Sequence, residues 1–411
     1  MQGTQNMVIA GASLAGAKAA EALREQGFDG PVTLIGDEAH RPYERPPLSK
    51  DYLIGKAELS TVFVHEEGWY AANDVGLLLG SRVARVDRSA HEVELTDGTT
   101  RSYHKLLLAT GSSPRTLPVD GADARGVLYL RRIEDSERLR HTLGEIGRLA
   151  VIGAGWIGLE AAAAARMAGV EVTVIEMAAA PLLRVLGPEV AEVFTRLHRD
   201  QGVDFRFNTE LRGISTANGR ATGVRLADGS TIGADAVLVA VGAAPNTRLA
   251  EDAGLRVRDG IVADAGLATD DPDIYATGDA VSAYHPFLGI HLRVEHWANA
   301  LNQPATAAAA MLGKDAAYDN LPYFFTDQYD LGMEYTGHVA DGDYDQVVFR
   351  GDVAAREFIA FWLKDGRVLA GMNVNVWDVT DPIKDLIRTR AQVDPAALAD
   401  PDQPLTELAP G

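Results

Sequence analysis

The chain reads VIAGASLAG over residues 8–16 and VIGAGWIGLE over residues 151–160. Each stretch closes an apolar run and opens an alanine-rich one, which is the strand–turn–helix context of a dinucleotide-binding fingerprint. Glycines in such a turn let the backbone bend tightly and approach a pyrophosphate, whose charge meets the free N–H groups at the start of the helix. Two copies therefore predict that two dinucleotides are bound at once. The residues of the two turns that we expect at these sites are Gly11, Ser13 and Gly16, and Gly153, Gly155, Ile157 and Gly158.

A carboxylate follows the second apolar run of each copy. The run VTLI leads to Gly36, Asp37 and Glu38, and the run VTVI leads directly to Glu176. We assign Asp37 to the adenosine ribose of the first dinucleotide, with Glu38 as the alternative. Glu176 would accept hydrogen bonds from a ribose 2′-hydroxyl and repel a 2′-phosphate, and no arginine or lysine stands between residues 177 and 183. The sequence therefore favours NADH over NADPH.

The composition is ordinary for a globular enzyme, with 46% hydrophobic and 23% charged residues, and 411 residues suggest two to three domains. A formal net charge of −20 disfavours nucleic acid and anionic membranes as partners. The chain has no cysteine, which excludes disulfides, thiolate metal sites, bound iron–sulfur clusters and catalytic thiols, and no metal site is expected. No apolar stretch reaches membrane-spanning length, and the first core strand is expected too early for a signal peptide. We therefore expect a cytoplasmic protein.

The stretch at residues 41–53 contains three prolines, which are expected to block a helix until Leu48. It is therefore predicted to be a loop with a functional role. Farther on, a buried run ends in a turn at Gly111, and a similar buried run ends in a turn at Gly242. The two halves of the chain therefore look related, and Gly242 is a further candidate binding residue.

A short apolar run at residues 274–276 is followed by Asp279 at the start of a predicted turn. One interpretation is a solvated turn acid. The other is an acid that binds the polar middle of a long dinucleotide, which requires the chain to return to its first domain after visiting a second. From about Asp319 the sequence alternates aromatic-rich strands with a helix near residues 381–389, which predicts a small α+β domain. The Pro- and Ala-rich tail beyond about Val393 is expected to be loosely ordered.

With both fingerprints and the segments RPPLSK, TGD and EHWANA, the chain resembles the FAD-dependent pyridine-nucleotide oxidoreductases. Within them it is similar to the ferredoxin and rubredoxin reductases of the putidaredoxin reductase and biphenyl dioxygenase ferredoxin reductase type. The likeness covers residues 7 to about 390. It implies an α/β fold with two nested Rossmann-like domains, as in glutathione reductase. The implied domains are an FAD domain at residues 1–112 and 243–318, an NAD domain at 113–242, and a C-terminal α+β interface domain at 319–411.

The resemblance also assigns roles to residues. It implies FAD contacts for Ala15, Asp37, Lys50, Val83, Arg131, Asp279 and Val294. Trp297 would lie beside the flavin, with a core role as the alternative. Lys50 and Glu160 are the expected catalytic residues, because a cation near flavin N5 stabilises the anionic reduced ring and can pair with a carboxylate. A surface charge and an ordinary helix residue are the alternatives for them. Arg184 is a candidate contact of the NAD adenosine, or a solvated arginine, and Phe325 stands where close relatives often carry tryptophan.

The function implied is hydride transfer from NADH to FAD, followed by release of electrons one at a time to a small [2Fe–2S] ferredoxin, or less favourably a rubredoxin. That partner would serve a cytochrome P450 or a ring-hydroxylating dioxygenase. Disulfide reductases and NADH peroxidases of the same fold need a thiol, so the lack of cysteine argues against them. Two alternatives stay open: reduction of a quinone, dioxygen or another small acceptor, and an NADH-sensing flavoprotein without a catalytic role. At a net charge of −20, docking of an acidic ferredoxin requires a local basic face or apolar contacts.

Overall fold

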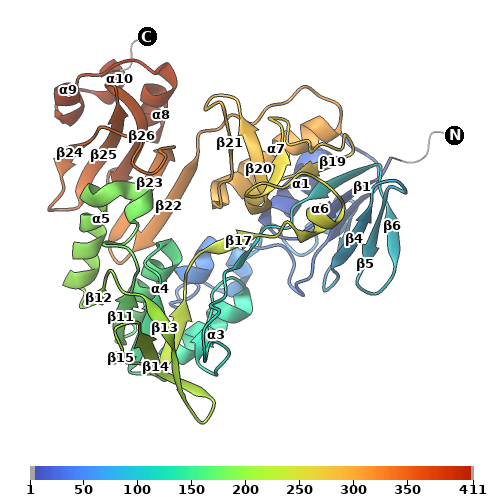
Figure 1. Ribbon diagram of the computed structural model, residues 1–411. Coiled ribbons are helices and arrows are strands. Elements are labelled where there is room, and N and C mark those ends of the chain that lie inside the picture. The colour runs from blue at the N-terminus through green and yellow to red at the C-terminus, as the bar shows by residue number, and fades with distance from the viewer. Residues whose placement is uncertain (1–4, 409–411) are drawn as a thin grey trace. The chain divides into compact units, whose positions relative to one another are not determined.

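The computed structural model describes residues 5–408, which fall into two compact units (Figure 1). The first unit comprises the described residues up to Arg45 together with Glu58–Ser113 and Ala243–Asn320. The second comprises Pro46–Ala57, Pro114–Gly242 and the described residues from Leu321 onward. Each unit is therefore assembled from separate segments of the chain.

A parallel sheet in the order β19-β7-β1-β2-β3 forms the core of the first unit. Its strands are β1 Met7–Ala10, β2 Val32–Ile35, β3 Val75–Leu78, β7 Lys105–Leu108 and β19 Ile274–Ala276. Every residue of β1 is buried, as expected for a strand covered on both faces. Helices α1 Leu14–Glu25 and α7 Trp297–Met311 pack against each other in this unit. Ile274 pairs with Leu106, so the chain does return to its first sheet, as the sequence predicted.

The first unit also contains shorter elements. A three-stranded antiparallel sheet consists of β4 Val83–Asp87, β5 Glu92–Leu95 and β6 Thr100–Ser102. The other strands of this unit are β17 Ala243–Pro245, β18 Ile261–Ala263, β20 Val281–His285 and β21 Ile290–Leu292. Strand β8 Ser112–Pro114 begins in this unit and ends at the first residue of the next segment of the second unit. The other helices of the first unit are α2 Trp69–Ala72 and α6 Arg248–Asp252, with 3₁₀ helices η2 Leu59–Val62 and η3 Gly278–Ala280.

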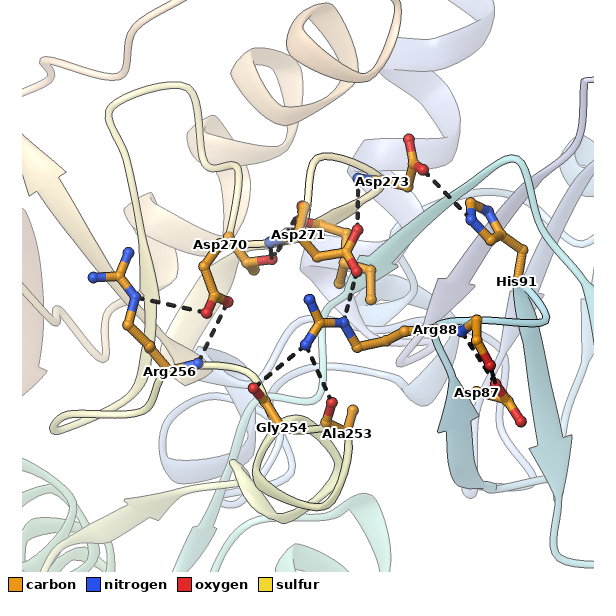
Figure 2. A network of polar contacts seen from close by, with 12 residues as sticks. Asp87, Arg88, His91, Ala253, Gly254, Arg256, Asp270, Asp271 and Asp273 are labelled. Atoms are coloured by element: carbon orange, nitrogen blue, oxygen red, sulfur yellow. Dashed lines mark hydrogen bonds and ion pairs between the residues drawn. The ribbon is translucent and has the colours of Figure 1, made fainter.

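A network of charged side chains joins two distant segments of the first unit (Figure 2). Arg88, which follows β4, lies 2.6 Å from Asp271 and also donates to two backbone carbonyls after α6. Asp273 pairs with Lys105 at 2.6 Å. Burial alone would raise the pKa of Asp271, but hydrogen bonds from the Asp273 N–H and from Arg88 hold it below its ordinary value. These contacts secure the segment that leads into β19 and then to Asp279.

The second unit contains a parallel sheet in the order β12-β11-β10-β16-β9. Its strands are β9 Val127–Leu128, β10 Arg148–Ile152, β11 Glu171–Ile175, β12 Asp204–Arg206 and β16 Ala236–Val239. The helices of this part are α3 Ile133–Leu143, α4 Trp156–Met167 and α5 Leu183–Asp200. A small antiparallel sheet is made by β13 Leu211–Ala217, β14 Arg220–Leu226 and β15 Thr231–Gly233. The sheet order places β10, which enters the second fingerprint, at the centre.

An antiparallel sheet in the order β22-β23-β26-β25-β24 follows in the same unit (Figure 1). Its strands are β22 Tyr323–Gln328, β23 Leu331–Gly337, β24 Gln346–Asp352, β25 Glu357–Lys364 and β26 Arg367–Val374. Its helices are α8 Thr380–Thr389, α9 Pro395–Ala399 and α10 Leu405–Leu408. The α+β character expected beyond Asp319 is therefore present.

The parallel sheet and the C-terminal sheet of the second unit contribute to one hydrophobic core. The ring centroids of Trp156 in α4 and Phe324 in β22 are 5.0 Å apart. The buried Trp362 of β25 donates its Nε1–H to the backbone carbonyl of Leu186 in α5. Aromatic side chains thus connect the predicted NAD segment to the C-terminal sheet. The three-domain division drawn from the sequence stays a prediction.

The prediction for the proline-rich loop was wrong in one respect. A 3₁₀ helix, η1, spans Pro46–Ser49, so the prolines begin a helical turn where they were expected to block one until Leu48. Proline is tolerated at the start of a helix because its missing N–H would have no partner there and its φ already suits the turn.

The prediction of a loosely ordered tail was also wrong for residues 395–408; residues 409–411 lie outside the described part. Helices α9 and α10 pack through Leu398 and Leu405, which are 0% and 7% exposed. Asp394 caps α9 by accepting a hydrogen bond from the Ala396 N–H at 2.9 Å, a signal that the sequence carried in its Asp-Pro pair. Arg350 of β24 donates to four backbone carbonyls of this tail, at 2.6 to 3.4 Å.

Within residues 5–408, no helix combines the length and the apolar character that crossing a bilayer demands. In the same described range, no group of three His, Cys, Asp or Glu side chains is placed to hold a metal ion.

Candidate functional site

The first fingerprint forms the turn between β1 and α1. Gly11 has φ +125°, and a Cβ there would lie 2.0 Å from the carbonyl oxygen of Ala109. A Cβ on Gly16 would lie 2.0 Å from the carbonyl oxygen of Gly11. Ser13, in contrast, has φ −121°, which any residue adopts, and it stands at the N-cap of α1. The replacement of a fingerprint glycine by Ser13 therefore puts no strain on the turn.

The second fingerprint repeats this geometry between β10 and α4. Gly153 has φ +99°, and a Cβ there would lie 2.4 Å from the carbonyl oxygen of Ala240. A Cβ on Gly158 would lie 2.2 Å from the carbonyl oxygen of Gly153. Gly155 is the N-cap of α4, and a Cβ on it would meet no atom within 4 Å. The space over Gly155 is thus open, and the N–H groups that begin α4 face no helical partner, which suits a pyrophosphate.

Glu176, at the end of β11, is bound to the second fingerprint. Its Oε2 accepts a hydrogen bond from the N–H of Ala154 at 2.8 Å, and its Oε1 accepts one from the N–H of Ala178 at 2.8 Å. Each oxygen keeps a further lone pair for a ribose hydroxyl. The carboxylate is therefore held in position before any dinucleotide arrives.

The structure separates the two candidate acids of the first fingerprint. Glu38 accepts hydrogen bonds from Tyr43 and from Arg45, the latter at 2.9 Å, so the alternative ribose ligand is already engaged. Asp37 is exposed directly after the turn that follows β2. The assignment of the ribose to Asp37, with Glu38 as the alternative, stays a prediction.

Asp279 lies beside the first fingerprint. It belongs to η3, directly after β19, and accepts a hydrogen bond from the Ser112 hydroxyl at 2.8 Å. A Cβ on the neighbouring Gly278 would lie 3.3 Å from the Cβ of Ala15, and the Gly278 N–H donates to the buried Gln303 at 2.9 Å. Gly278, which precedes Asp279, therefore lies close to Ala15 of the first fingerprint. The role of Asp279 in binding a dinucleotide stays a prediction.

Val83, Val294 and Trp297 also belong to the first unit. Val83 is part of its hydrophobic core, and Val294 is half-buried. The half-buried Trp297 donates its Nε1–H to Glu44 at 3.0 Å, so its ring has a polar anchor. Burial lowers the pKa of the adjacent His296 to about 4, although Asp279 acts in the opposite direction. His296 is therefore a neutral imidazole at pH 7.

Lys50 and Glu160 form the ion pair expected from the sequence. Lys50 Nζ lies 2.8 Å from Glu160 Oε1, and the two side chains are 13% and 5% exposed. Lys50 follows η1, and Glu160 lies one turn into α4. The ring centroid of Phe325, the residue at the usual tryptophan position, is 5.2 Å from Lys50 Nζ. Both alternatives, a surface charge and an ordinary helix residue, are therefore disfavoured by burial and contact.

The second unit holds further candidates. Arg131 is half-buried just before α3, Arg184 is exposed in α5, and Ile157 is 44% exposed in the first turn of α4. Gly242 follows β16 with φ +95°, and its carbonyl oxygen accepts a hydrogen bond from the N–H of Arg115. Lys50 and Arg131 thus belong to the unit of the second fingerprint, whereas the other implied FAD contacts belong to the unit of the first.

The sequence-based reasoning missed four side chains that hold these residues. Ser112 and Gln303 contact the Gly278–Asp279 turn, and Ser49 and Thr326 both donate hydrogen bonds to Glu160. The alternation of β22 gives a signal for Thr326, which occupies an inward position between the buried Phe324 and Gln328. Nothing in the chain's periodicity indicates which acid it would meet.

Comparison with known proteins gives a consistent picture. Residues 5–304 match the family described as pyridine nucleotide-disulphide oxidoreductase, and residues 323–409 match a family described as reductase C-terminal. An anthranilate 1,2-dioxygenase system ferredoxin--NAD(+) reductase component from Burkholderia cepacia is 44% identical over 96% of this chain and 97% of its own.

Two solved structures also align over nearly the whole chain. The ferredoxin reductase for the CYP199A2 system from Rhodopseudomonas palustris has a TM-score of 0.95 and 37% identity, covering 99% of this chain and 100% of its own. The covalent putidaredoxin reductase–putidaredoxin complex has a TM-score of 0.93 and 38% identity, covering 98% of each chain.

Proposed function

Because the chain belongs to the pyridine nucleotide-disulphide oxidoreductase family, we propose that it is an FAD-dependent ferredoxin reductase that oxidises NADH. Its electrons pass through FAD to a small [2Fe–2S] ferredoxin, which serves a cytochrome P450 or a ring-hydroxylating dioxygenase. The names of the relatives support this choice: one is the reductase component of a dioxygenase system, and another is joined covalently to putidaredoxin in its solved structure.

The observation that carries the proposal is the buried Lys50–Glu160 pair in the same unit as the second fingerprint. A positive charge held away from water acts strongly on charge that develops on a neighbouring ring, because low polarity weakens its screening. The chain has no thiol to take up electrons, so its own residues provide positioning and charge while the electrons need another acceptor.

FAD supplies the chemistry that the side chains lack: it accepts a hydride and releases electrons singly. In our proposal the first turn, through Gly11, Ser13, Ala15 and Gly16, binds its pyrophosphate. Asp37 orients its adenosine ribose. The further contacts that we propose for it are Lys50, Val83, Arg131, Asp279, Val294 and Trp297.

NADH occupies the second turn in this proposal. The contacts that we propose for it are Gly153, Gly155, Ile157, Gly158, Glu160, Glu176, Arg184 and Gly242. Glu176 accepts hydrogen bonds from the ribose, and Lys50 supplies the cation that favours the reduced flavin, held in place by Glu160. We keep the predicted division into an FAD domain, an NAD domain and a C-terminal interface domain as part of the proposal. The cytoplasmic location stays a prediction.

The test is steady-state oxidation of NADH by the purified holoenzyme with three acceptors. We expect a yellow protein with one FAD per chain that reduces a [2Fe–2S] ferredoxin in the presence of NADH. Ferricyanide reports flavin reduction without a protein partner, and a quinone tests the small-acceptor alternative. Rapid ferricyanide or quinone reduction with no ferredoxin reduction would contradict the proposal. Binding of NADH without turnover of any acceptor would favour a sensing role.

A further inference from the structure

Glu160 is the end of a chain of buried hydrogen bonds in the second unit. Besides Lys50, its Oε1 accepts a hydrogen bond from the Thr326 hydroxyl at 2.5 Å, and its Oε2 accepts one from the Ser49 hydroxyl. Gln328 donates its Nε2–H to the Thr326 oxygen at 3.2 Å, and His198 Nε2 lies 2.8 Å from Gln328 Oε1. The side chains from His198 to Glu160 thus form an uninterrupted series.

All members of this series are withdrawn from water. Thr326 and His198 are 0% exposed, Gln328 is 1% exposed, and Glu160 is 5% exposed. A buried polar group without a hydrogen-bond partner costs free energy. Each group in such a series must therefore act as donor or acceptor as its neighbour requires. No water competes for the Thr326 hydroxyl or for the Gln328 amide.

The direction of each hydrogen bond follows from the chemistry of the groups. A Gln amide accepts only through Oε1 and donates only through Nε2, so His198 donates to Gln328 and Gln328 donates to Thr326. The Thr326 oxygen then accepts one bond, and its single hydrogen points to Glu160, which as a carboxylate can only accept. Tyr329 lies 3.3 Å from the other ring nitrogen of His198, where its hydroxyl can donate. The whole series is polarised toward the carboxylate.

We propose that Thr326 and Gln328 are positioning residues, which orient Glu160 and moderate its negative charge beside Lys50. The inference rests on the proposed function in one respect, because it is through Lys50 that the series acts on the flavin. A donor directed at Glu160 Oε1 spreads its charge, so Lys50 presents more of its own positive charge to the ring. Because Thr326 and Gln328 belong to β22, the C-terminal sheet takes part in setting the electrostatics of the ion pair.

Thr326→Val removes the hydroxyl and keeps the shape of the side chain. We expect a lower flavin midpoint potential and a limiting rate of flavin reduction by NADH that falls about fivefold, on the order expected for one hydrogen bond. Thr326→Ser restores the donor and should restore both values. Thr195→Val is the matched control, because Thr195 is also buried in this unit but donates only to the Ala191 carbonyl of its own helix.

Redox titration of the holoenzyme gives the potential without turnover, and stopped-flow mixing gives the rate without an acceptor. A wild type that fails to reduce ferredoxin would therefore contradict the proposed function and leave this test intact. Adding Thr326→Val to Glu160→Gln should change the potential little if Thr326 acts through the carboxylate.

Two outcomes would overturn the inference: a potential unchanged by Thr326→Val, or an equal shift in the Glu160→Gln background. If Thr326→Val does not fold, Gln328→Met breaks the series at its next member, and its potential decides in the same way. A crystal structure of either variant supplies a readout that does not depend on the flavin. It should show the Glu160 carboxylate turned from its place against Lys50, and an unchanged ion pair would count against the proposal.

Discussion

Lys50 combines a full charge with a largely buried position, since its side chain is 13% exposed and paired with Glu160. We expect Lys50→Met to lower the flavin midpoint potential and to slow reduction by NADH, because the reduced anion loses a nearby cation. Redox titration and stopped-flow absorbance measure the two effects. Lys56→Met, in the same segment but exposed, is the control. Equal values for Lys50→Met and wild type would remove Lys50 from the mechanism.

Glu176 is fixed by two backbone N–H groups before a nucleotide binds. We expect Glu176→Ala to weaken NADH binding by about 1–3 kcal/mol, the range for leaving polar groups unpaired, and to reduce the preference for NADH over NADPH. Titration calorimetry with both nucleotides measures this. Glu171→Ala changes an exposed carboxylate of the same strand and should bind NADH as wild type does. A wild type that prefers NADPH would refute the assignment of Glu176.

His198 links the stability of the second unit to pH. Burial lowers its pKa to about 4, against an ordinary 6.5, and the hydrogen bond to Gln328 only partly opposes this. The unfolded chain therefore takes up the proton first, so stability is complete above pH 6.5 and falls as the pH drops toward 4. The loss attributable to His198 approaches about 3 kcal/mol at the lower limit.

The corresponding variant is His198→Gln, which keeps a donor for Gln328 but does not titrate. We expect its Tm to depend less on pH than that of wild type between pH 6.5 and 4. Differential scanning calorimetry at several pH values checks this. His141→Gln alters a histidine whose side chain is 75% exposed and should leave the pH dependence unchanged. If the Tm of His198→Gln and of wild type fall in parallel as the pH drops, His198 does not cause the loss of stability at low pH.

At the scale of secondary-structure elements, the C-terminal helices depend on a single arginine. Arg350 of β24 donates to the carbonyls of Leu398, Asp400, Pro401 and Gln403. We expect Arg350→Met to destabilise this tail by about 1–3 kcal/mol, because four hydrogen bonds from a charged donor are lost and two of them are part-buried. Limited proteolysis should then cut within residues 395–408 sooner than in wild type. Arg138→Met removes only an exposed i,i+3 pair and should change nothing.

The elements that the sequence predicted correctly have a strong local signal. The runs VTLI and VTVI are continuous and apolar, each lies between a fingerprint helix and an acid, and both are strands at the expected residues. The short helices η1 and α9 bury few side chains, so the sequence has no apolar periodicity that would predict them. Their local signals are the proline pair that begins η1 and the Asp394–Pro395 pair that begins α9.

The candidate site was predictable to the extent that it depends on local turns. The positive φ of Gly11 and Gly153 follows from their motif, and so does the position of Glu176. The contact of Lys50 with Glu160 joins residues far apart in sequence, and the family resemblance indicated it where periodicity could not. Thr326 and Gln328 escaped notice because a polar side chain on the inward face of a strand does not reveal its partner.

For the molecule as a whole, net charge opposes docking of an acidic ferredoxin. Arg45 pairs with Glu38, and Arg293, which is 12% exposed, pairs with Asp259, so neither presents an uncompensated positive charge. Lys384, which pairs with Asp381 at 2.9 Å, and Arg388 belong to α8, which packs on the C-terminal sheet. We take Lys384 and Arg388 as the basic face whose contribution to ferredoxin docking can be tested.

We expect Lys384→Gln combined with Arg388→Gln to lower kcat/KM for ferredoxin and to leave ferricyanide reduction unchanged. Raising the salt concentration should have the same effect on wild type, since the Debye length falls from about 10 Å at 0.1 M to about 3 Å at 1 M. Lys314→Gln, which removes one positive charge from an exposed position of the first unit, serves as the control. A rate that rises with salt would indicate that overall repulsion dominates and that docking is apolar.

The route of the chain through its two units also constrains its synthesis on the ribosome. Strand β19, which pairs with β7 at one edge of the first sheet, is translated only after the entire second parallel sheet. At ordinary elongation rates β7 waits on the order of ten seconds or more for that partner. During this interval it offers an open strand edge, which other nascent chains can pair with. Truncated products that end before residue 274 are therefore expected to aggregate, and neither unit can be obtained by expressing one continuous fragment.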